Sequence, residues 1–258
     1  MFTAQLPRSR LLLAALGLGG AAAVLLLAAP LGTRAGLWHF GFGFRVLRWS
    51  VYLAGAGFLV TLVALAALAS TRPRLPGSRP AVTAFAALLL ALGVAAPSLS
   101  QWHKARSLPP INDITTNPAD PPEFTRAGSG VAGGAAGAPY PGVEFADAQR
   151  AAYGDLATLR VGRSAHAVFR AALDTARASR GWTVVTAEAR AGHIEATART
   201  PWFGFEDDVA IRVRRVGEMS EVDVRSRSRV GTSDVGANAE RIRSYRRRLA
   251  ERLGGAVR

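Results

Sequence analysis

The residues best suited to chemistry lie in one stretch near the C-terminus, from Thr200 to Arg241. Two adjacent acids, Asp207 and Asp208, precede a run rich in arginine, and a Ser-Asp-x-Gly-x-Asn pattern follows that run. A carboxyl group in an apolar setting is suited to acid–base chemistry, and arginines beside a helix start are suited to binding an anion. The elements around these residues decide which of them share a surface.

A β-hairpin is predicted to carry both acids. Apolar and polar residues alternate on each side of Gly217–Glu218, a pair that suits a two-residue turn. Closing the turn at this pair sets Val213 opposite Val222. Ile211 then faces Val224, so both apolar sets share one face of the hairpin.

The same register explains most of the charge on the hairpin. On the polar face, which we expect to be exposed, it sets acids opposite arginines, and each such pair stabilises a sheet by about 0.2–1 kcal/mol. Asp207 has no such explanation, because it falls on the apolar face opposite Ser228. It is either a structural acceptor for backbone donors or a site residue that acts as an acid or base. The predicted pairs are Arg214–Glu221, Arg212–Asp223, Asp208–Arg227 and Glu206–Arg229.

The turn after the hairpin is the second candidate site. Gly231 permits a sharp bend, and Ser233 or Asp234 can cap the last helix. A helix start flanked by Arg229 and Arg241 is also suited to binding an anion, although it matches no phosphate-binding motif. No residue is assigned as catalytic, and Asp207 is the candidate for that role. The predicted ligand-binding residues are Asp207, Ser228, Arg229, Gly231, Ser233, Asp234, Asn238 and Arg241.

These residues belong to a soluble α+β domain that is predicted over 145–258. A strand over 156–161 precedes a helix that starts after Ser164 and stops at Gly181. Two alternating segments, 182–186 and 194–198, precede the hairpin, and a final helix is predicted over 235–253. The predicted order is β-α-β-β-β-β-α, which forms an antiparallel sheet with two helices packed on one face.

The first 106 residues predict a membrane region. Three uncharged segments, at 11–31, 49–70 and 81–100, are long enough to cross a bilayer, which takes about 20 residues. The first segment is longer than the apolar part of a signal peptide and two more spans follow it, so we expect a retained helix. The chain therefore predicts three transmembrane α-helices followed by the soluble domain.

Residues 107–144 are predicted to join the two regions. The first part is rich in proline and short polar residues, which favours extended backbone. The second part, 128–142, is mostly glycine and alanine and is typical of a flexible tether. Asp113 and Asp120 match no calcium-binding loop and are interpreted as turn residues.

The charges that flank the spans do not decide the orientation, because an N-terminus inside the cell places five basic residues on each side. The dense arginine cluster at 72–79 favours an inside N-terminus. The protein is then a multi-pass protein of the cell inner membrane, with its C-terminal domain on the periplasmic side. The net charge of +14 favours anionic partners. We expect the lipid bilayer, with an anionic lipid or another envelope protein, as partner.

Several kinds of catalytic site are excluded by the sequence. The chain has no cysteine, so it has no thiolate nucleophile and no thiolate metal site. Its four histidines show no zinc-binding spacing, and the Gly-x-Ser-x-Gly elbow of many hydrolases does not occur. No metal and no cofactor is therefore predicted.

Several long motifs together resemble a known family. The chain resembles the bacterial membrane members of the family known as domain of unknown function 1499. That resemblance implies no activity, but it implies that Asp207, Asp208 and the polar residues of 225–238 act as one unit. The insertion at 128–138 departs from the tighter spacing expected in the family. The motifs are PPINDITTNPADPPEF, AAYGDL, TPWFGFEDDVAIRVR and VDVRSRSRVGTSDVGANAERIR.

Two classes of function fit these features. The first is an uncharacterised integral membrane protein whose soluble domain is a non-enzymatic module that binds an anionic ligand, a lipid or an envelope partner. The alternative is a hydrolase or transferase that uses Asp207 with Ser228 or Ser233. A weaker alternative is nucleic-acid binding by the basic last helix, which requires a cytoplasmic domain and is disfavoured by the predicted orientation.

Overall fold

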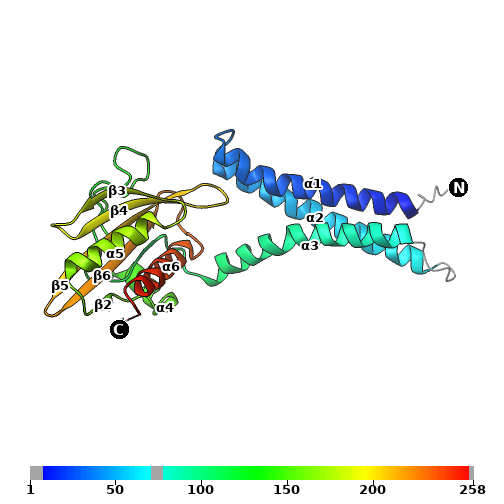
Figure 1. Ribbon diagram of the computed structural model, residues 1–258. Coiled ribbons are helices and arrows are strands. Elements are labelled where there is room, and N and C mark those ends of the chain that lie inside the picture. Colours follow the sequence, from blue (N-terminus) through cyan, green and yellow to red (C-terminus); the bar gives the residue numbers. More distant parts are fainter. Residues whose placement is uncertain (1–7, 71–77, 256–258) are drawn as a thin grey trace. The chain divides into compact units, whose positions relative to one another are not determined.

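The computed structural model describes residues 8–70 and 78–255 of the 258-residue chain. The chain divides into two compact units, Met1–His103 and Lys104–Arg258. Figure 1 shows that the first unit consists of long helices and that the second combines strands with shorter helices. Two arginines on which the predicted orientation rests, Arg72 and Arg74, lie outside the described residues.

Three long helices make up the first unit, and each is long and apolar enough to cross a membrane. This confirms the three predicted spans, although the second helix begins at Phe40 rather than near Trp49. The last helix continues past the apolar span, and its final residues fall in the second unit. The helices are α1 (Arg8–Arg34), α2 (Phe40–Ala69) and α3 (Ser78–Ser107).

Small residues let these helices approach closely. A Cβ atom added at Gly57 of α2 would lie 3.2 Å from the carbonyl oxygen of Ala15 in α1. One added at Gly19 of α1 would lie 3.0 Å from the Cβ of Leu90 in α3. Membrane helices commonly pack through such small residues, because lipid supplies no hydrophobic force between them.

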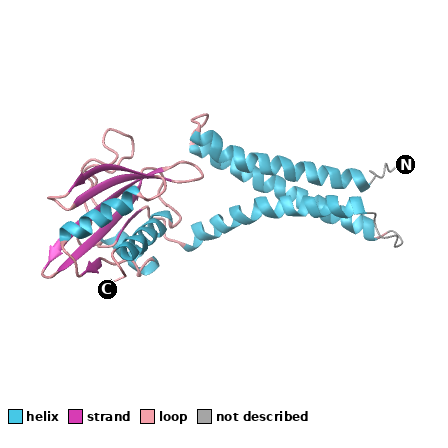
Figure 2. Ribbon diagram, viewed as in Figure 1, coloured by secondary structure: helices cyan, strands magenta, loops and turns pink. Residues whose placement is uncertain are grey.

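The second unit is an antiparallel sheet with helices, as predicted (Figure 2). The predicted β-α-β-β-β-β-α order is confirmed from β2 to α6, and the structure adds a first short strand and a helix before them. The elements are β1 (Asp113–Thr115), α4 (Val143–Ala152), β2 (Leu159–Val161), α5 (Ala165–Arg177), β3 (Trp182–Glu188), β4 (His193–Arg199), β5 (Glu206–Val216), β6 (Met219–Ser228) and α6 (Ala237–Arg252).

The strands follow the order β1-β6-β5-β4-β3, and β2 pairs with β6 on the same side as β1. Helices α5 and α6 bury their apolar residues, such as Val168 and Ile242, against Ile211 and Val224 of the sheet. We call this the inner face. We call the opposite side of the sheet the outer face. It carries Asp208 and the other strand residues that lie between successive core residues.

The predicted hairpin register is confirmed in β5 and β6. Val213 pairs with Val222 and Ile211 pairs with Val224. Asp207 lies opposite Ser228, on the inner face, as the alternation predicted. The two-residue turn holds Gly217 at φ +60°, a left-handed conformation that favours glycine.

Two local predictions were wrong. The last helix begins at Ala237 rather than Val235, because Val235 and Gly236 are both left-handed, at φ +53° and +81°. Residues 107–144 were expected to join the two regions, with a flexible tether over 128–142. Residues 108–142 instead lie against the outer face of the sheet and contribute β1 to it, with extended backbone as predicted only for the first part.

Candidate functional site

Asp207 is buried at the end of β5 and pairs with Arg241 of α6. Its carboxylate also accepts a hydrogen bond from the Ser228 hydroxyl across the hairpin. Alternation along the strand turns Asp207 towards the helices, and α6 then brings the guanidinium over it. The only carboxylate of the hairpin that the sequence left unexplained is therefore part of an ion pair between sheet and helix.

Asn238 connects the other members of this cluster. Its amide nitrogen donates to Ser228 Oγ at 3.0 Å and to the Asn112 carbonyl at 3.0 Å. Its amide oxygen accepts from Ser226 Oγ at 2.8 Å and from Arg241. The amide is buried and fully used by protein partners, which gives it a structural role in joining α6 to β6. We call Asp207, Ser226, Ser228, Asn238 and Arg241 the inner cluster.

The turn between β6 and α6 is held from two sides. Asp234 accepts hydrogen bonds from the backbone N–H groups of Gly236 and Asn238, at 2.8 and 2.7 Å, and so caps α6 as predicted. Asn112, before β1, donates to the Gly231 carbonyl at 2.6 Å. Ser233 accepts from the Val235 N–H at 3.3 Å. The N–H groups that would hold an anion at this helix start are already bonded to Asp234.

Two carboxyl groups here have raised pKa values. Burial raises the pKa of Asp207, and the attraction of Arg241 and the Ser228 hydrogen bond only partly offset it. Burial also raises the pKa of Asp234, against the hydrogen bonds from Asn238 and Gly236, and the nearby Asp207 charge raises it further. A buried carboxyl with a raised pKa holds a proton more readily than one in water, which is the property of a general acid.

Arg229 does not join this cluster. It donates to Asp208 on the outer face, at 2.7 Å from Nη2, and pairs with Glu206. Its guanidinium also donates to Thr197 Oγ1 at 2.9 Å. Arg229 and Arg241 therefore bind adjacent acids on opposite faces of β5, so the eight predicted residues do not converge on one site.

The outer face carries a buried charge network that the sequence placed in solvent. Arg225 is 1 % exposed and forms a two-pronged ion pair with Asp113 of β1, with nitrogen–oxygen distances of 2.9 and 2.7 Å. The guanidinium also lies over the ring of Phe124, 4.7 Å from its centroid, and near Tyr140. Asp113 was interpreted as a turn residue, and this is corrected: it is a buried strand residue. Through Arg225 it binds residues 108–142, which we call the covering segment, to β6.

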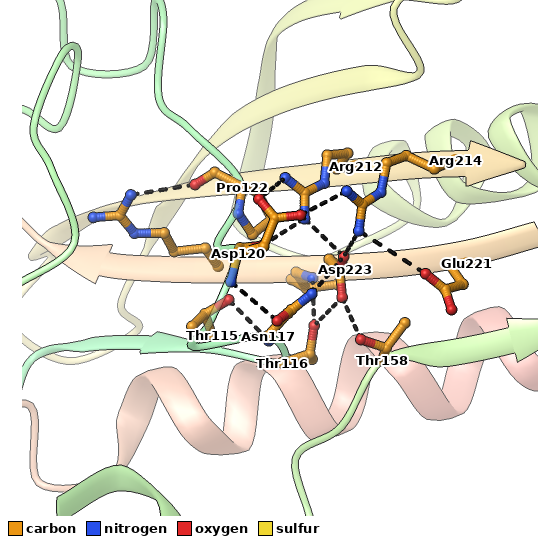
Figure 3. A network of polar contacts seen from close by, with 12 residues as sticks. Thr115, Thr116, Asn117, Asp120, Pro122, Thr158, Arg212, Arg214, Glu221 and Asp223 are labelled. Atoms are coloured by element: carbon orange, nitrogen blue, oxygen red, sulfur yellow. Dashed lines mark hydrogen bonds and ion pairs between the residues drawn. The ribbon is translucent and has the colours of Figure 1, made fainter. Parts of the chain in front are cut away.

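A second part of this network surrounds Asp223, as Figure 3 shows. Its carboxylate accepts from Arg212 at 2.9 Å, as the register predicted, and from Thr158 at 2.6 Å. Asp120 of the covering segment binds both Arg212 and Arg214, which lowers the pKa of Asp120. The charges of β5 and β6 are thus neutralised in two ways: by pairs between the two strands, and by acids of residues 113–120, which lie on the outer face.

Glu195 of β4 holds the next stretch of the covering segment. It is buried and accepts hydrogen bonds from the backbone N–H groups of Thr125, Arg126 and Ala127. It also lies 2.7 Å from Nε2 of His193. Burial alone raises the pKa of a carboxyl, but these hydrogen bonds, led by that of His193, lower the pKa of Glu195 to about 2.

Glycines bring the covering segment against the sheet. A Cβ atom at Gly133 would lie 2.1 Å from the Arg229 carbonyl oxygen, and one at Gly128 would lie 2.4 Å from Asp208 Oδ2. Both glycines have φ above +70°, which favours glycine as well. The stretch that composition assigned to a flexible tether is therefore a tightly packed layer over Asp208.

Sequence reasoning missed the residues that fix this layer, above all Asn112, Asp113 and Glu195. Asn112 and Asp113 lie in a motif that carried the family resemblance, whereas Glu195 lies outside those motifs and had no signal. No local pattern shows which strand a distant acid will meet. Among residues 8–70 and 78–255, no three histidine, aspartate or glutamate side chains gather as a metal site. The polar groups instead bind other groups of the same chain.

Comparisons with known proteins place part of the chain in a family. No curated protein matches the chain. The model described as protein of unknown function (DUF1499) matches residues 113–249, from β1 to α6. The matched region therefore includes the covering segment, the outer-face network and the inner cluster. Because it spans more than half of the chain, the protein belongs to the family of proteins of unknown function DUF1499.

Proposed function

We propose that the protein is a multi-pass inner-membrane protein whose C-terminal domain is a non-enzymatic module that binds anionic lipid at the bilayer surface. The observation that carries this proposal is an exposed aromatic side chain at the edge where the chain enters the domain. That edge consists of the β4–β5 turn (200–205) and the β6–α6 turn (229–236), and we call it the entry edge.

The first residues after α3 are bound to the entry edge. A Cβ atom added at Gly236 would lie 3.1 Å from Leu108, the residue directly after α3. Asn112 donates to Gly231, and the Asp234 N–H donates to the Ile111 carbonyl at 3.3 Å. The entry edge is therefore bound to residues that follow α3 directly in the sequence.

Exposed apolar groups lie at this edge. Trp202 is 59 % exposed and Val230 is 37 % exposed. The turns are neighbours, because the Arg229 N–H donates to the Glu206 carbonyl at 3.3 Å. Tryptophan is enriched at the boundary between lipid headgroups and acyl chains, where its ring is partly dehydrated and its N–H stays bonded.

Basic residues supply the preference for anionic lipid. Lys104 in the last turn of α3 and Arg199 directly before the β4–β5 turn are exposed, and a basic residue close to an anionic membrane contributes about 1 kcal/mol. All the acidic residues of the chain follow Lys104, but those on the hairpin are neutralised by the networks of both faces. The domain therefore presents little opposing charge from its most acidic stretch.

The absence of cysteine makes a direct test simple. A single cysteine replaces Val230, carries an environment-sensitive fluorophore, and is measured in the full chain reconstituted in nanodiscs with or without phosphatidylglycerol. Lipid-attached quenchers should quench this label, and more strongly with the anionic lipid. The matched control is Arg190→Cys, in the β3–β4 turn at the other end of β4. Equal quenching at both positions, or none at Val230→Cys, would contradict the proposal.

The orientation needs its own experiment. We propose an inside N-terminus and a periplasmic C-terminal domain, because the dense arginine cluster then lies inside. A reporter fused after Arg258 that is active only outside the cytoplasm should be active. A fluorescent protein that folds only in the cytoplasm should be dark at the same position, and the reverse result would place the domain inside.

The raised pKa of Asp207, beside the Ser228 hydroxyl, favours one second candidate: a hydrolase or transferase that uses Asp207 as acid or base. Among the described residues, Ser233 forms no hydrogen bond with Asp207, so it does not support this role. Asp207→Asn should then abolish cellular function while the melting temperature is nearly unchanged. Loss of folding in this variant, or retained function, would exclude the catalytic role.

A further inference from the structure

A cavity of about 570 Å³ opens between the covering segment and the turn that joins β3 to β4. It is lined by Thr125, Arg126, Ser129, Glu188, Ala191 and His193. This volume is within the range of about 300–1,000 Å³ that is typical of small-molecule sites. None of these residues was predicted as a site residue, and the cavity lies away from the inner cluster, at the opposite end of β4 from Arg199.

One wall of the cavity is rigidly held. Glu195 accepts hydrogen bonds from the backbone N–H groups of the lining residues Thr125 and Arg126, and of Ala127. The same carboxylate lies 2.7 Å from His193 Nε2 and so holds the imidazole ring in place. A site whose walls are already fixed loses less entropy when a ligand binds.

Two charges of opposite sign line the cavity without neutralising each other. Arg126 and Glu188 are both exposed, and neither forms an ion pair with any described residue. The other acids of the described strands form ion pairs within the protein, so Glu188 differs from them. The Ser129 hydroxyl adds a donor and acceptor on the Arg126 side.

We propose that this cavity binds a small zwitterion, a molecule that carries an acidic group and an amino group. The acidic group, a phosphate or carboxylate, binds the planar guanidinium of Arg126 and the Ser129 hydroxyl, with His193 beside it. The amino group binds the carboxylate of Glu188. A ligand with both charges satisfies both side chains, whereas a simple anion leaves Glu188 as a repelling neighbour.

The zwitterion could come from solution or from a lipid headgroup, and the position of the cavity favours solution. His193 and Arg199 mark the two ends of β4, which are about 20 Å apart at the usual rise of a strand. The cavity is therefore separated from the entry edge by about the length of β4. This inference does not depend on lipid binding at that edge.

The test uses the full chain in nanodiscs of phosphatidylcholine and phosphatidylglycerol, with isothermal titration calorimetry. The probes are O-phosphoethanolamine, inorganic phosphate and ethanolamine. O-phosphoethanolamine should bind saturably and about tenfold or more tightly than either fragment, because it makes both charged contacts and each fragment makes only one. Nanodiscs that contain phosphatidylethanolamine distinguish the source: unchanged probe affinity indicates a soluble ligand, and competition indicates a headgroup.

Variants test whether binding depends on the charges of Arg126 and Glu188. Arg126→Gln and Glu188→Gln should each weaken O-phosphoethanolamine by about tenfold, and Glu188→Gln should also remove the preference over inorganic phosphate. Arg170→Gln, the same charge change on α5 at the inner face, should leave the affinity unchanged. No saturable binding of O-phosphoethanolamine, equal affinity for phosphate in the wild type, or insensitivity to both cavity variants would overturn the proposal.

Discussion

The two faces of the sheet handle buried charge in opposite ways. On the outer face, acids and arginines are matched by a layer of covering residues, so that Asp113, Asp223 and Glu195 each bind several donors. On the inner face, the apolar core continues to the end of the sheet, where Asp207 has Arg241 and one hydroxyl. The outer face stabilises ionised carboxylates, and the inner face disfavours the ionised form.

The difference appears in the pKa values. The pKa of Glu195 is lowered from 4.5 to about 2, so its contribution to stability is present above 4.5 and is lost as the pH falls towards 2. The pKa values of Asp207 and Asp234 are raised above 3.8 by burial. Their contribution is greatest when they are protonated and is lost as the pH rises through the raised values. Protonation of Glu195 therefore weakens the outer face, and ionisation of Asp207 and Asp234 weakens the inner cluster.

The largest expected effect comes from breaking the outer-face ion pair. Asp113→Ala leaves the Arg225 guanidinium buried without its partner, which costs about 3–5 kcal/mol. The measurement is the free energy of opening of β6 amides, from hydrogen exchange of the full chain in detergent. The double variant Asp113→Asn with Arg225→Met removes both charges and should recover much of the loss. A loss below about 1 kcal/mol would show that the covering layer does not depend on this pair.

Removing the only cation of the inner cluster should act on stability in a pH-dependent way. Arg241→Gln leaves Asp207 buried without its counter-charge, so the pKa of Asp207 rises further and opening of β5 becomes easier by about 3 kcal/mol at neutral pH. The loss should shrink as the pH is lowered, because protonated Asp207 needs no cation. Hydrogen exchange at pH 5 and pH 8 measures this. The double variant with Asp207→Asn should show no such difference, and a loss that is equal at both pH values in the single variant would contradict the comparison.

A variant of Glu195 tests whether stability on the outer face has the opposite pH dependence. Glu195→Gln keeps the shape but removes the charge that the backbone of 125–127 and His193 bind, and we expect a loss of about 2 kcal/mol at neutral pH. Below pH 4.5 the wild type should lose stability towards that of the variant, because its own carboxylate becomes protonated. Thermal unfolding of the two proteins between pH 7 and pH 2.5 checks this. Parallel curves over that range would show that Glu195 does not titrate with a lowered pKa.

The sequence predicted one face better than the other for a physical reason. The alternation of Val209 to Val213 and the Gly217–Glu218 turn fixed the register, which in turn placed Asp207 on the inner face. Such signals are local. The outer face depends on contacts such as Arg225–Asp113 and Ala127–Glu195, between residues far apart in the sequence. Glycine-rich composition indicated flexibility at 128–138, whereas positive φ angles and close packing account for the same glycines. The cavity between Arg126 and Glu188 depends on that packing and has no local signature.

The smallest effect concerns the strained residue beside the inner cluster. Val235 is held at φ +53°, which is unfavourable for a β-branched side chain by about 1–3 kcal/mol. Glycine adopts this conformation without strain but loses more entropy on folding, so Val235→Gly should stabilise the α6 start by at most about 1 kcal/mol. Val235→Ala keeps the Cβ atom and serves as the control, since it retains most of the strain. Hydrogen exchange of the first turn of α6 measures both variants. If glycine instead destabilises this turn, the side chain of Val235 contributes packing that outweighs its strain, and the turn is then fixed by apolar contact as well as by the Asp234 cap.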